Sequence, residues 1–269
     1  MWFTRDSRRC TILNLKKEAE PVKQEEFRLS KCPNCESYVC HMYFMQDAKT
    51  KKQSKWFSCS CGVVFQDSKP SLVYDKKYWD KYNEYSAKIE DSYKYPVRIY
   101  SPLIEELAYG RKVLLIGRQT DHQERAFADR GWIPYSIDKN EYQESSDRLF
   151  IGDFENYDFP EGLKFNMIWA YHTLECFSDP IASLSKIKSL LTEDGILFLA
   201  SPDTDFINTR GSTGFIHWKP EDNHIMWNRS TITRRLENLG FNVIMCRQNY
   251  EHRFPAWDDF HLIAQKKFF

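Results

Sequence analysis

Short apolar runs alternate with segments of helical periodicity from Arg111 to the end of the chain. The run Lys112–Gly117 (KVLLIG) is apolar after its lysine and ends in glycine, which is typical of a parallel strand buried on both faces. The segment Pro180–Leu191 carries apolar residues at helical spacing and stops before Asp194 and Gly195. This alternation of strands and helices predicts a parallel, doubly wound sheet.

Two adjacent strands close the pattern, Asn242–Cys246 and Phe260–Gln265, and they fit an antiparallel edge. The fold class predicted for residues 109–269 is therefore α/β, a Rossmann-like, doubly wound and mostly parallel sheet with an antiparallel edge strand. The first five strands are expected at Lys112–Gly117, Trp132–Ile137, Leu149–Ile151, Phe165–Ala170 and Ile196–Ala200.

The residues before this domain divide by composition. Residues 1–28 are charged and weakly patterned, which predicts an irregular N-terminal arm. Residues 67–108 are rich in tyrosine and charge, and they predict a helical connector. We expect its aromatic stripe to pack on the following domain. The stripe consists of Tyr74, Tyr78, Trp79, Tyr82 and Tyr85.

Two close cysteine pairs in residues 29–66 predict a small zinc ribbon. Four thiolates from two knuckles can surround Zn²⁺ tetrahedrally, and a site closed by four protein ligands stabilises folding without doing chemistry. The second pair is CxC where CxxC is usual, so Cys40 and His41 stay open as substitute ligands, and free structural cysteines are the other interpretation. The four predicted zinc ligands are Cys32, Cys35, Cys59 and Cys61.

Composition narrows the class of protein further. The formal net charge of zero argues against a general nucleic-acid binder. The sequence has no apolar run of the roughly 18 residues that a membrane span needs, and no signal-peptide pattern at its start. The cysteine spacing indicates a metal site with unpaired thiols and not a disulfide framework, so we expect a cytoplasmic protein.

Two stretches carry a resemblance to a known family. Ile168–Asp203 contains a strand, the segment HTLECFSDP, a helix, the turn LTEDG and another strand. Gly214–Val243 contains a histidine-bearing segment before a helix that ends in Gly-Phe. The chain resembles class I S-adenosylmethionine-dependent methyltransferases, particularly the branch related to ubiquinone and sugar methyltransferases, in which some members carry an N-terminal zinc ribbon. The resemblance implies S-adenosylmethionine as the cofactor.

Residues that follow the strands are the candidate cofactor site, because this fold binds ligands outside the carboxyl ends of its strands. Asp138 ends the second strand, where a carboxylate accepts from ribose hydroxyls; capping a helix is its alternative role. The resemblance implies that Asp153 and Phe154 contact the adenine, and that Tyr171 and His172 face the sulfonium and the acceptor. A purely structural role for His172 stays open.

The turn after the first strand departs from the glycine-rich pattern of the family. Gly117 is kept, whereas Gln119 and Asp121 stand where the second and third glycines are expected. A side chain there takes space that the backbone needs to approach a ligand, and a positive φ costs more for glutamine. Arg118 is a candidate partner for the methionine carboxylate. The sequence therefore leaves two outcomes, a reorganised cofactor site or a lost one.

Two functions follow from these outcomes. The first is methyl transfer to an unidentified acceptor, with His172, His217 and His224 as candidate general bases. The second is a catalytically inactive methyltransferase-like domain that serves as a structural or interaction module, docked to a protein partner through its zinc ribbon or aromatic connector. The cofactor-site residues that persist favour the enzyme.

Overall fold

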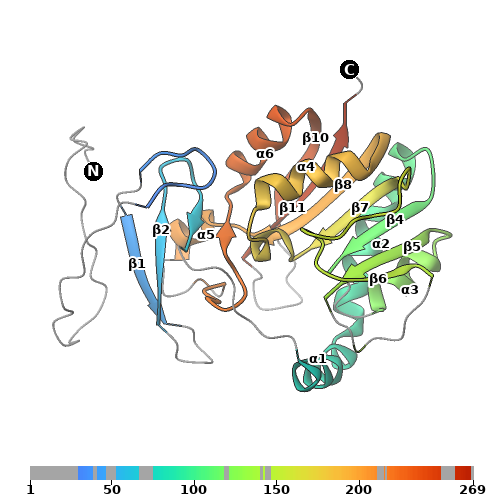
Figure 1. Ribbon diagram of the computed structural model, residues 1–269, viewed down its shortest axis with the longest axis horizontal. Helices are drawn as coiled ribbons and strands as arrows, with labels where there is room; N and C mark the ends of the chain where they lie inside the picture. Colours follow the sequence, from blue (N-terminus) through green and yellow to red (C-terminus); the bar gives the residue numbers. More distant parts are fainter. Residues whose placement is uncertain are drawn as a thin grey trace.

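A computed structural model provides the structure of the chain, which holds two β-sheets and the helices around them (Figure 1). The predicted N-terminal arm and Cys40 lie outside the residues that the structure describes. The described residues are 30–38, 41–46, 53–66, 75–117, 121–139, 142, 147–210, 215, 217–249 and 258–267.

The larger sheet has seven strands within the described residues, in the order β10-β11-β8-β7-β4-β5-β6. Neighbours from β8 to β6 run parallel, and β11 is antiparallel to both β8 and β10. The predicted fold class is confirmed, with the antiparallel strand lying one position in from the edge. The strands are β4 (Lys112–Ile116), β5 (Ile133–Asp138), β6 (Leu149–Ile151), β7 (Phe165–Tyr171), β8 (Leu191–Pro202), β10 (Phe241–Gln248) and β11 (Asp259–Lys266).

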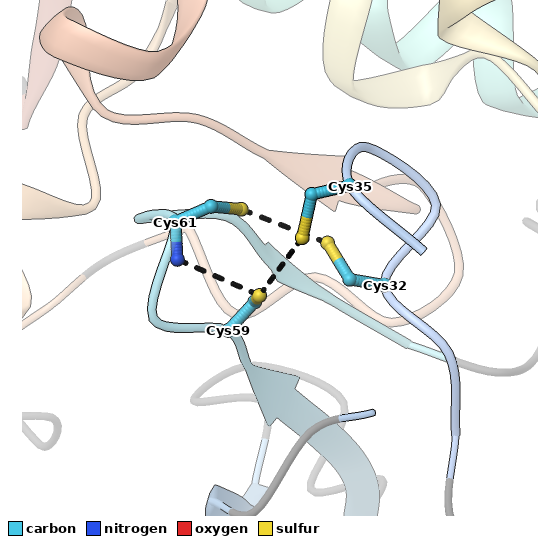
Figure 2. Close-up of side chains that lie close together, drawn as sticks. All are labelled: Cys32, Cys35, Cys59 and Cys61. Carbon is cyan, nitrogen blue, oxygen red and sulfur yellow. Dashed lines mark hydrogen bonds between the residues drawn. The ribbon is translucent and has the colours of Figure 1, made fainter. Parts of the chain in front are cut away.

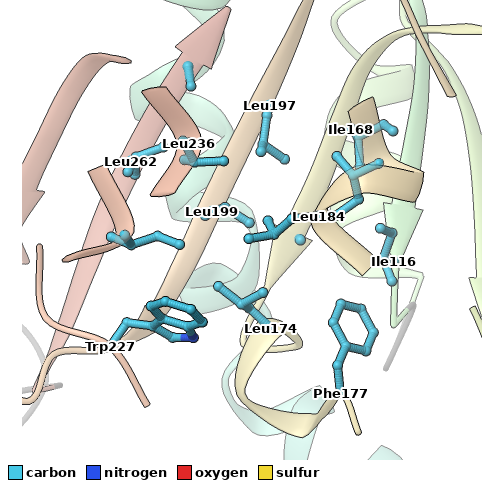
Figure 3. Packing of buried hydrophobic residues seen from close by; sticks show 14 of the residues in the cluster. Ile116, Ile168, Leu174, Phe177, Leu184, Leu197, Leu199, Trp227, Leu236 and Leu262 are labelled. Atoms are coloured by element: carbon cyan, nitrogen blue, oxygen red, sulfur yellow. The ribbon is translucent and has the colours of Figure 1, made fainter. Parts of the chain in front are cut away.

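Helices cover both faces of this sheet, which explains its continuous apolar strands. On one face, α2 (Glu90–Leu107) and α3 (His122–Ala128) contribute buried apolar residues to a core with Val113 and Leu115. On the other face, α4 (Pro180–Leu190) and α6 (Arg229–Asn238) contribute Leu184 and Leu236 to a core that includes Ile116 of β4 (Figure 3). Because both sides of β4 are buried, its sequence shows no polar alternation.

The strand order reverses at β4, and this reversal locates the site. The chain runs outward from β4 through β5 to β6, and then returns to β7 on the opposite side of β4. Crossovers that leave in opposite directions open a crevice at the carboxyl ends of β4 and β7. Gly117 follows β4 at this point, and His172 follows β7 with φ of 53°.

The smaller sheet joins the cysteine-rich region to the later part of the chain. Its order is β1-β2-β3-β9, and every pair is antiparallel. In β9, Met226 pairs with Val64 of β3 and Ile225 pairs with Phe65. The ribbon therefore shares a sheet with the rest of the chain. The strands are β1 (His41–Gln46), β2 (Gln53–Ser58), β3 (Val64–Phe65) and β9 (Ile225–Met226).

Two further helices and one turn complete the described elements: α1 (Lys76–Lys88), α5 (Asp205–Arg210) and the 3₁₀ turn η1 (Leu174–Cys176). Of the α1 aromatics, Trp79 is buried, and the rings of Tyr78 and Tyr82 stack at 6.0 Å. Among the helices that the structure describes, none combines the length and apolarity needed to cross a membrane.

Candidate functional site

Gly117 and Thr173 meet at the reversal between β4 and β7. Gly117 has φ of 73° and donates its N–H to the Ile137 carbonyl at 2.9 Å. A Cβ at this position would lie well inside contact distance of the Thr173 methyl group. Thr173 Oγ1 is buried and has no hydrogen-bond partner among the described residues. The absence of a side chain at Gly117 thus leaves room for Thr173, whose buried hydroxyl has no hydrogen-bond partner among the described residues.

The altered glycine turn is described only at its two ends. Arg118 and Gln119 lie outside the described residues. Asp121 forms an ion pair with Arg125 of α3 at 3.2 Å, so its carboxylate is already engaged. His122 and Gln123 follow it, and both side chains are buried. Each has an Nε2 atom without a hydrogen-bond partner among the described residues. Unsatisfied buried donors of this kind are rare in folded proteins, and they suit a bound polar group.

Asp138 and Asp153 occupy different environments. Asp138 is buried at the end of β5, and its backbone carbonyl accepts from the N–H of Gly152 at 2.8 Å. Asp153 pairs with Lys139 at 2.9 Å and accepts from the N–H of Glu155 at 3.1 Å. Asp138 therefore lies at the carboxyl end of its strand, and its contact with a ribose stays a prediction, whereas Asp153 is held by its neighbours.

The aromatic candidates are largely covered by protein. Phe154 is 3% exposed, and its ring stacks on Phe177 at 5.6 Å. Tyr171 is buried at the end of β7, where its ring stacks on Trp169 and meets His172 edge to face. Contacts of Phe154 and Tyr171 with a cofactor stay predictions.

His172 is held between two buried carboxylates. Its Nδ1 lies 3.1 Å from Glu175 Oε1, and its Nε2 lies 3.1 Å from Asp259 Oδ2. Burial alone would lower the pKa of His172, but the hydrogen bonds and charges of Asp259 and Glu175 outweigh it and raise the pKa to about 9. At neutral pH the ring is therefore an imidazolium, with both nitrogens donating to carboxylates.

The network around His172 continues across the sheet. Glu175 accepts from Ser201 Oγ at 2.9 Å, and Asp259 lies 3.5 Å from Nε2 of His261. His261 Nδ1 in turn lies 2.6 Å from the hydroxyl of Tyr100 on α2. Buried polar groups that partner one another in this way rigidify the site.

His217 stacks on this charged ring and remains neutral. The two ring centroids are 5.8 Å apart with planes 18° from parallel. Burial lowers the pKa of His217 well below its usual value, and the charge of His172 lowers it further. Within the described part of the chain, His217 Nε2 is buried without a hydrogen-bond partner. The pair thus combines one charged imidazolium with one neutral imidazole, which is the form that accepts a proton.

His224 is the third histidine candidate, and its backbone fastens the segment that carries His217. The His224 N–H donates to the Glu175 carbonyl at 2.6 Å, and the Asn223 side chain donates to the His217 carbonyl at 2.9 Å. Cys176 Sγ lies 3.5 Å from the Asp222 carboxylate. The structure therefore brings the loop after β7 and residues 217–224 together.

The helix α1 supplies tyrosine side chains to the same region. Burial raises the pKa of Tyr78, and the charges of Asp222 and Asp138 raise it further. Tyr82 and Tyr93 share a hydrogen bond of 2.6 Å between their hydroxyls, and the Tyr93 ring lies 5.9 Å from His122. Part of the aromatic connector thus contacts the start of α3.

The four predicted zinc ligands form a compact cluster (Figure 2). All four sulfurs lie within 4.8 Å of one another, with 3.7 Å between Cys32 and Cys61 and 3.5 Å between Cys35 and Cys59. A tetrahedral zinc with Zn–S bonds of about 2.3 Å separates its sulfurs by roughly 3.8 Å. The cluster therefore fits a zinc ribbon, and the shorter CxC knuckle supplies two of its sulfurs.

Several residues of the candidate site were not predicted from the sequence: Thr173, Glu175, Asp259 and His122. Glu175 lies in the HTLECFSDP segment, three residues beyond His172 in the chain, and that spacing was a usable signal. Asp259 is far from His172 in sequence, and no local pattern indicates their contact.

A family model described as a methyltransferase domain matches residues 87–245, more than half of the chain. The chain belongs to the methyltransferase-domain family. This match and the similar solved structures confirm the predicted resemblance to S-adenosylmethionine-dependent methyltransferases. A comparison with curated proteins finds no match.

Solved methyltransferase structures share the fold at low identity. One is a chain from the complex between the Haloferax volcanii Trm112 methyltransferase activator and a putative methyltransferase, 14% identical with a TM-score of 0.51, covering 72% of this chain and 99% of that one. Another is an S-adenosylmethionine-dependent methyltransferase from Clostridium acetobutylicum, 12% identical with a TM-score of 0.51, covering 70% and 98%. The plantazolicin methyltransferase BpumL, in complex with SAH, is 11% identical with a TM-score of 0.51, covering 72% and 91%.

Replacing Gly117 of the methyltransferase domain with alanine is expected to cost about 3 kcal/mol of unfolding free energy, from a strained positive φ and an overpacked contact with Thr173. Gly131→Ala is the matched control, because its φ of 78° is similar and nothing lies within 4 Å of the added Cβ; it should cost about 1 kcal/mol. Adding Thr173→Ser to Gly117→Ala removes the clashing methyl group and should restore part of the loss. Urea unfolding measures all four chains, and equal losses for the two alanine variants would contradict the contact.

Proposed function

We propose that the chain transfers a methyl group from S-adenosylmethionine to an acceptor at the carboxyl edge of β4, β5 and β7. The observation that carries this proposal is the buried, unsatisfied hydroxyl of Thr173 beside Gly117. Among the described residues, His122 and Gln123 at the start of α3 add two buried Nε2 atoms without a hydrogen-bond partner. A bound cofactor with several hydrogen-bonding groups would satisfy them. The family membership supports the same reaction class.

Each cofactor-site residue has a distinct proposed task. Gly117 lets the backbone turn at the end of β4, and Asp138 accepts from the ribose hydroxyls. Arg118 pairs with the methionine carboxylate, while Asp153, Phe154 and Tyr171 line the adenine and sulfonium sides. When bound, the cofactor supplies an electrophilic methyl group on a sulfonium. The protein's own part is to hold donor and acceptor in line and to exclude water.

His217 is the general base that we propose for acceptors that lose a proton. It is the neutral member of the stacked pair, and its free Nε2 gives it capacity to accept. His172 is already protonated, so we assign it the task of positioning His217 and keeping it uncharged. His224 is less buried and would act on the acceptor from the neighbouring loop.

The ribbon residues Cys32, Cys35, Cys59 and Cys61 would hold one structural zinc ion. Four protein sulfurs leave no open position, so the metal would stabilise the fold and would not contact the reacting groups. A protein partner at the ribbon stays a prediction from the sequence. Among the described ribbon residues, Tyr38 and Phe44 are exposed aromatic side chains that such a partner would cover.

Addition of S-adenosylmethionine at about 100 times its dissociation constant is expected to stabilise the protein by about 2.7 kcal/mol, and to raise its melting temperature by roughly 5 °C. Asp138→Ala should abolish the shift, because the buried carboxylate is the proposed ribose partner. Asp147→Ala, an exposed carboxylate, is the control and should leave the shift intact. Differential scanning fluorimetry and calorimetric titration measure both effects. No shift at millimolar cofactor, with zinc retained, would support the non-catalytic module instead.

A further inference from the structure

Gln66 lies directly after β3, at the junction of the ribbon and the methyltransferase domain. It is 1% exposed. Its side-chain amide donates to the carbonyl of Pro220 at 2.8 Å and to the carbonyl of Asn223. Its backbone N–H donates to the carbonyl of His224 at 3.0 Å. One ribbon residue therefore satisfies three carbonyl groups of the 217–224 segment.

The other side of this segment contacts the proposed acceptor site. The His224 N–H bonds to the carbonyl of Glu175, and Asn223 bonds to the carbonyl of His217. Glu175 is also one of the two carboxylates that hold His172. Residues 217–224 thus connect Gln66 to His172 and its carboxylate Glu175, and they carry His217, the second ring of the stacked pair.

The four-cysteine cluster also contacts the methyltransferase domain through a second set of hydrogen bonds. Arg235 of α6 donates to Asn34 Oδ1 at 2.9 Å, and Asn34 Nδ2 lies 3.6 Å from Cys61 Sγ. The carbonyls of Cys61 and Gly62 accept from Thr231 and Thr204. The CxC knuckle is therefore fixed both by its own sulfurs and by the methyltransferase domain.

Only a short segment connects Cys61 of the four-cysteine cluster to Gln66. After Cys61 and Gly62, the chain enters β3, whose two residues pair with β9. The Cys59 N–H donates to the Val63 carbonyl at 2.9 Å, which closes the knuckle onto the start of this strand. No unpaired loop lies between the knuckle and Gln66. A displacement of the knuckle would therefore also displace Gln66.

We propose that Gln66 is a positioning residue through which the metal-bound ribbon holds the 217–224 segment, and with it His217, against the acceptor site. Loss of the metal or of the Gln66 amide would release this segment while the seven-stranded sheet stays folded. The catalytic meaning of this inference rests on the proposed methyl transfer. The mechanical coupling does not, because it concerns contacts of the free protein.

Hydrogen–deuterium exchange of the full chain tests the coupling without any cofactor or acceptor. Four zinc-loaded proteins are compared: the unaltered chain, Gln66→Ala, Gln66→Glu and Gln265→Ala. Gln66→Glu keeps the size of the side chain, but it has no donor when ionised and at most one O–H when protonated, so it cannot replace both amide hydrogen bonds. Gln265→Ala is the matched control, because its amide also donates to a backbone carbonyl, that of Asp194 at 3.2 Å. The unaltered chain after zinc removal by a chelator is the fifth sample.

Amides of residues 217–224 are expected to exchange at least about tenfold faster in both Gln66 variants and after chelation, and at the original rate in Gln265→Ala. Zinc content should be unchanged in the Gln66 variants, and slow exchange of β4 and β8 should show that the sheet remains folded. Unchanged exchange in 217–224 for either Gln66 variant would overturn the assignment. So would chelation that leaves this segment protected.

Histidine NMR provides a readout that a purely structural role would not change. In the unaltered protein, His217 should stay neutral across the accessible pH range, because burial and the charge of His172 hold its pKa low. In Gln66→Glu the freed His217 should titrate in its ordinary range, near pH 6.5. A His217 signal that still fails to titrate would contradict the positioning role. If S-adenosylmethionine fails to bind while these changes occur, the proposed function fails and the coupling stands.

Discussion

Replacing Asp259 with asparagine is expected to lower the free energy of unfolding by about 3–5 kcal/mol at pH 7, because it removes one partner of a buried charge pair. Asp259 is fully buried, with Oδ2 at 3.1 Å from Nε2 of His172 and 3.5 Å from that of His261. Asparagine has nearly the same shape as aspartate, so the loss of unfolding free energy measures the effect of the charge more than that of packing. Asp147→Asn, an exposed carboxylate, should change stability by less than about 0.5 kcal/mol.

The pH dependence of this effect has a definite sign. The folded pKa of His172 is about 9, above its unfolded value of about 6.5. Its contribution is therefore complete below about pH 6.5 and is lost as the pH rises through 9. Burial opposes ionisation of Asp259, but its bonds to His172 and His261 hold its pKa below the usual range, so its contribution disappears only in strong acid. Urea unfolding at pH 7 and pH 10 should show a smaller difference between unaltered and variant protein at pH 10. A difference that stays constant would falsify the charged pair.

Cys59→Ser is expected to abolish stoichiometric zinc and to lower the melting temperature by about 10 °C. Structural zinc contributes roughly 10 kcal/mol or more of apparent binding energy in small zinc domains, and each thiolate is needed for tetrahedral closure. The ribbon sheet continues into β9, so disorder in the ribbon exposes Ile225 and Met226, which are both fully buried. Elemental analysis and thermal unfolding measure the two losses.

Cys246→Ser is the control for this substitution, because Cys246 lies outside the sulfur cluster. It should keep one zinc per chain. Burial raises the pKa of the Cys59 thiol, so zinc must displace its proton, and zinc affinity should fall as the pH falls. Full zinc content in Cys59→Ser would exclude Cys59 as a ligand and direct attention to Cys40 or His41.

The sequence predicted the larger sheet closely, because its signals are local. Leu149–Ile151 coincides with β6, and the run from Lys112 gives β4 to within one residue. The helix expected at Pro180–Leu191 is α4, which begins at Pro180 after the Asp179 cap and ends at Leu190. A buried strand or a capped helix can be recognised from a few consecutive residues of the sequence.

The candidate site was predicted less completely, because its decisive contacts join distant residues. The sequence indicated His172 and His217, but not that they stack or that one is charged. That distinction comes from Asp259, which reaches His172 from β11. The two-residue strand β9 was also missed, since a pair of residues has no periodicity to detect.

The pairing of β3 with β9 also bears on how the chain folds during synthesis. More than half of the chain separates β3 from β9 in the sequence. The sheet of the cysteine-rich ribbon is therefore complete only when β9 has been synthesised. At ordinary ribosomal speeds this interval is on the order of ten seconds. During that time the edge of β3 is unpaired, and such edges are prone to association with other chains. Early capture of zinc by the four cysteines would keep the nascent ribbon compact until its last strand arrives.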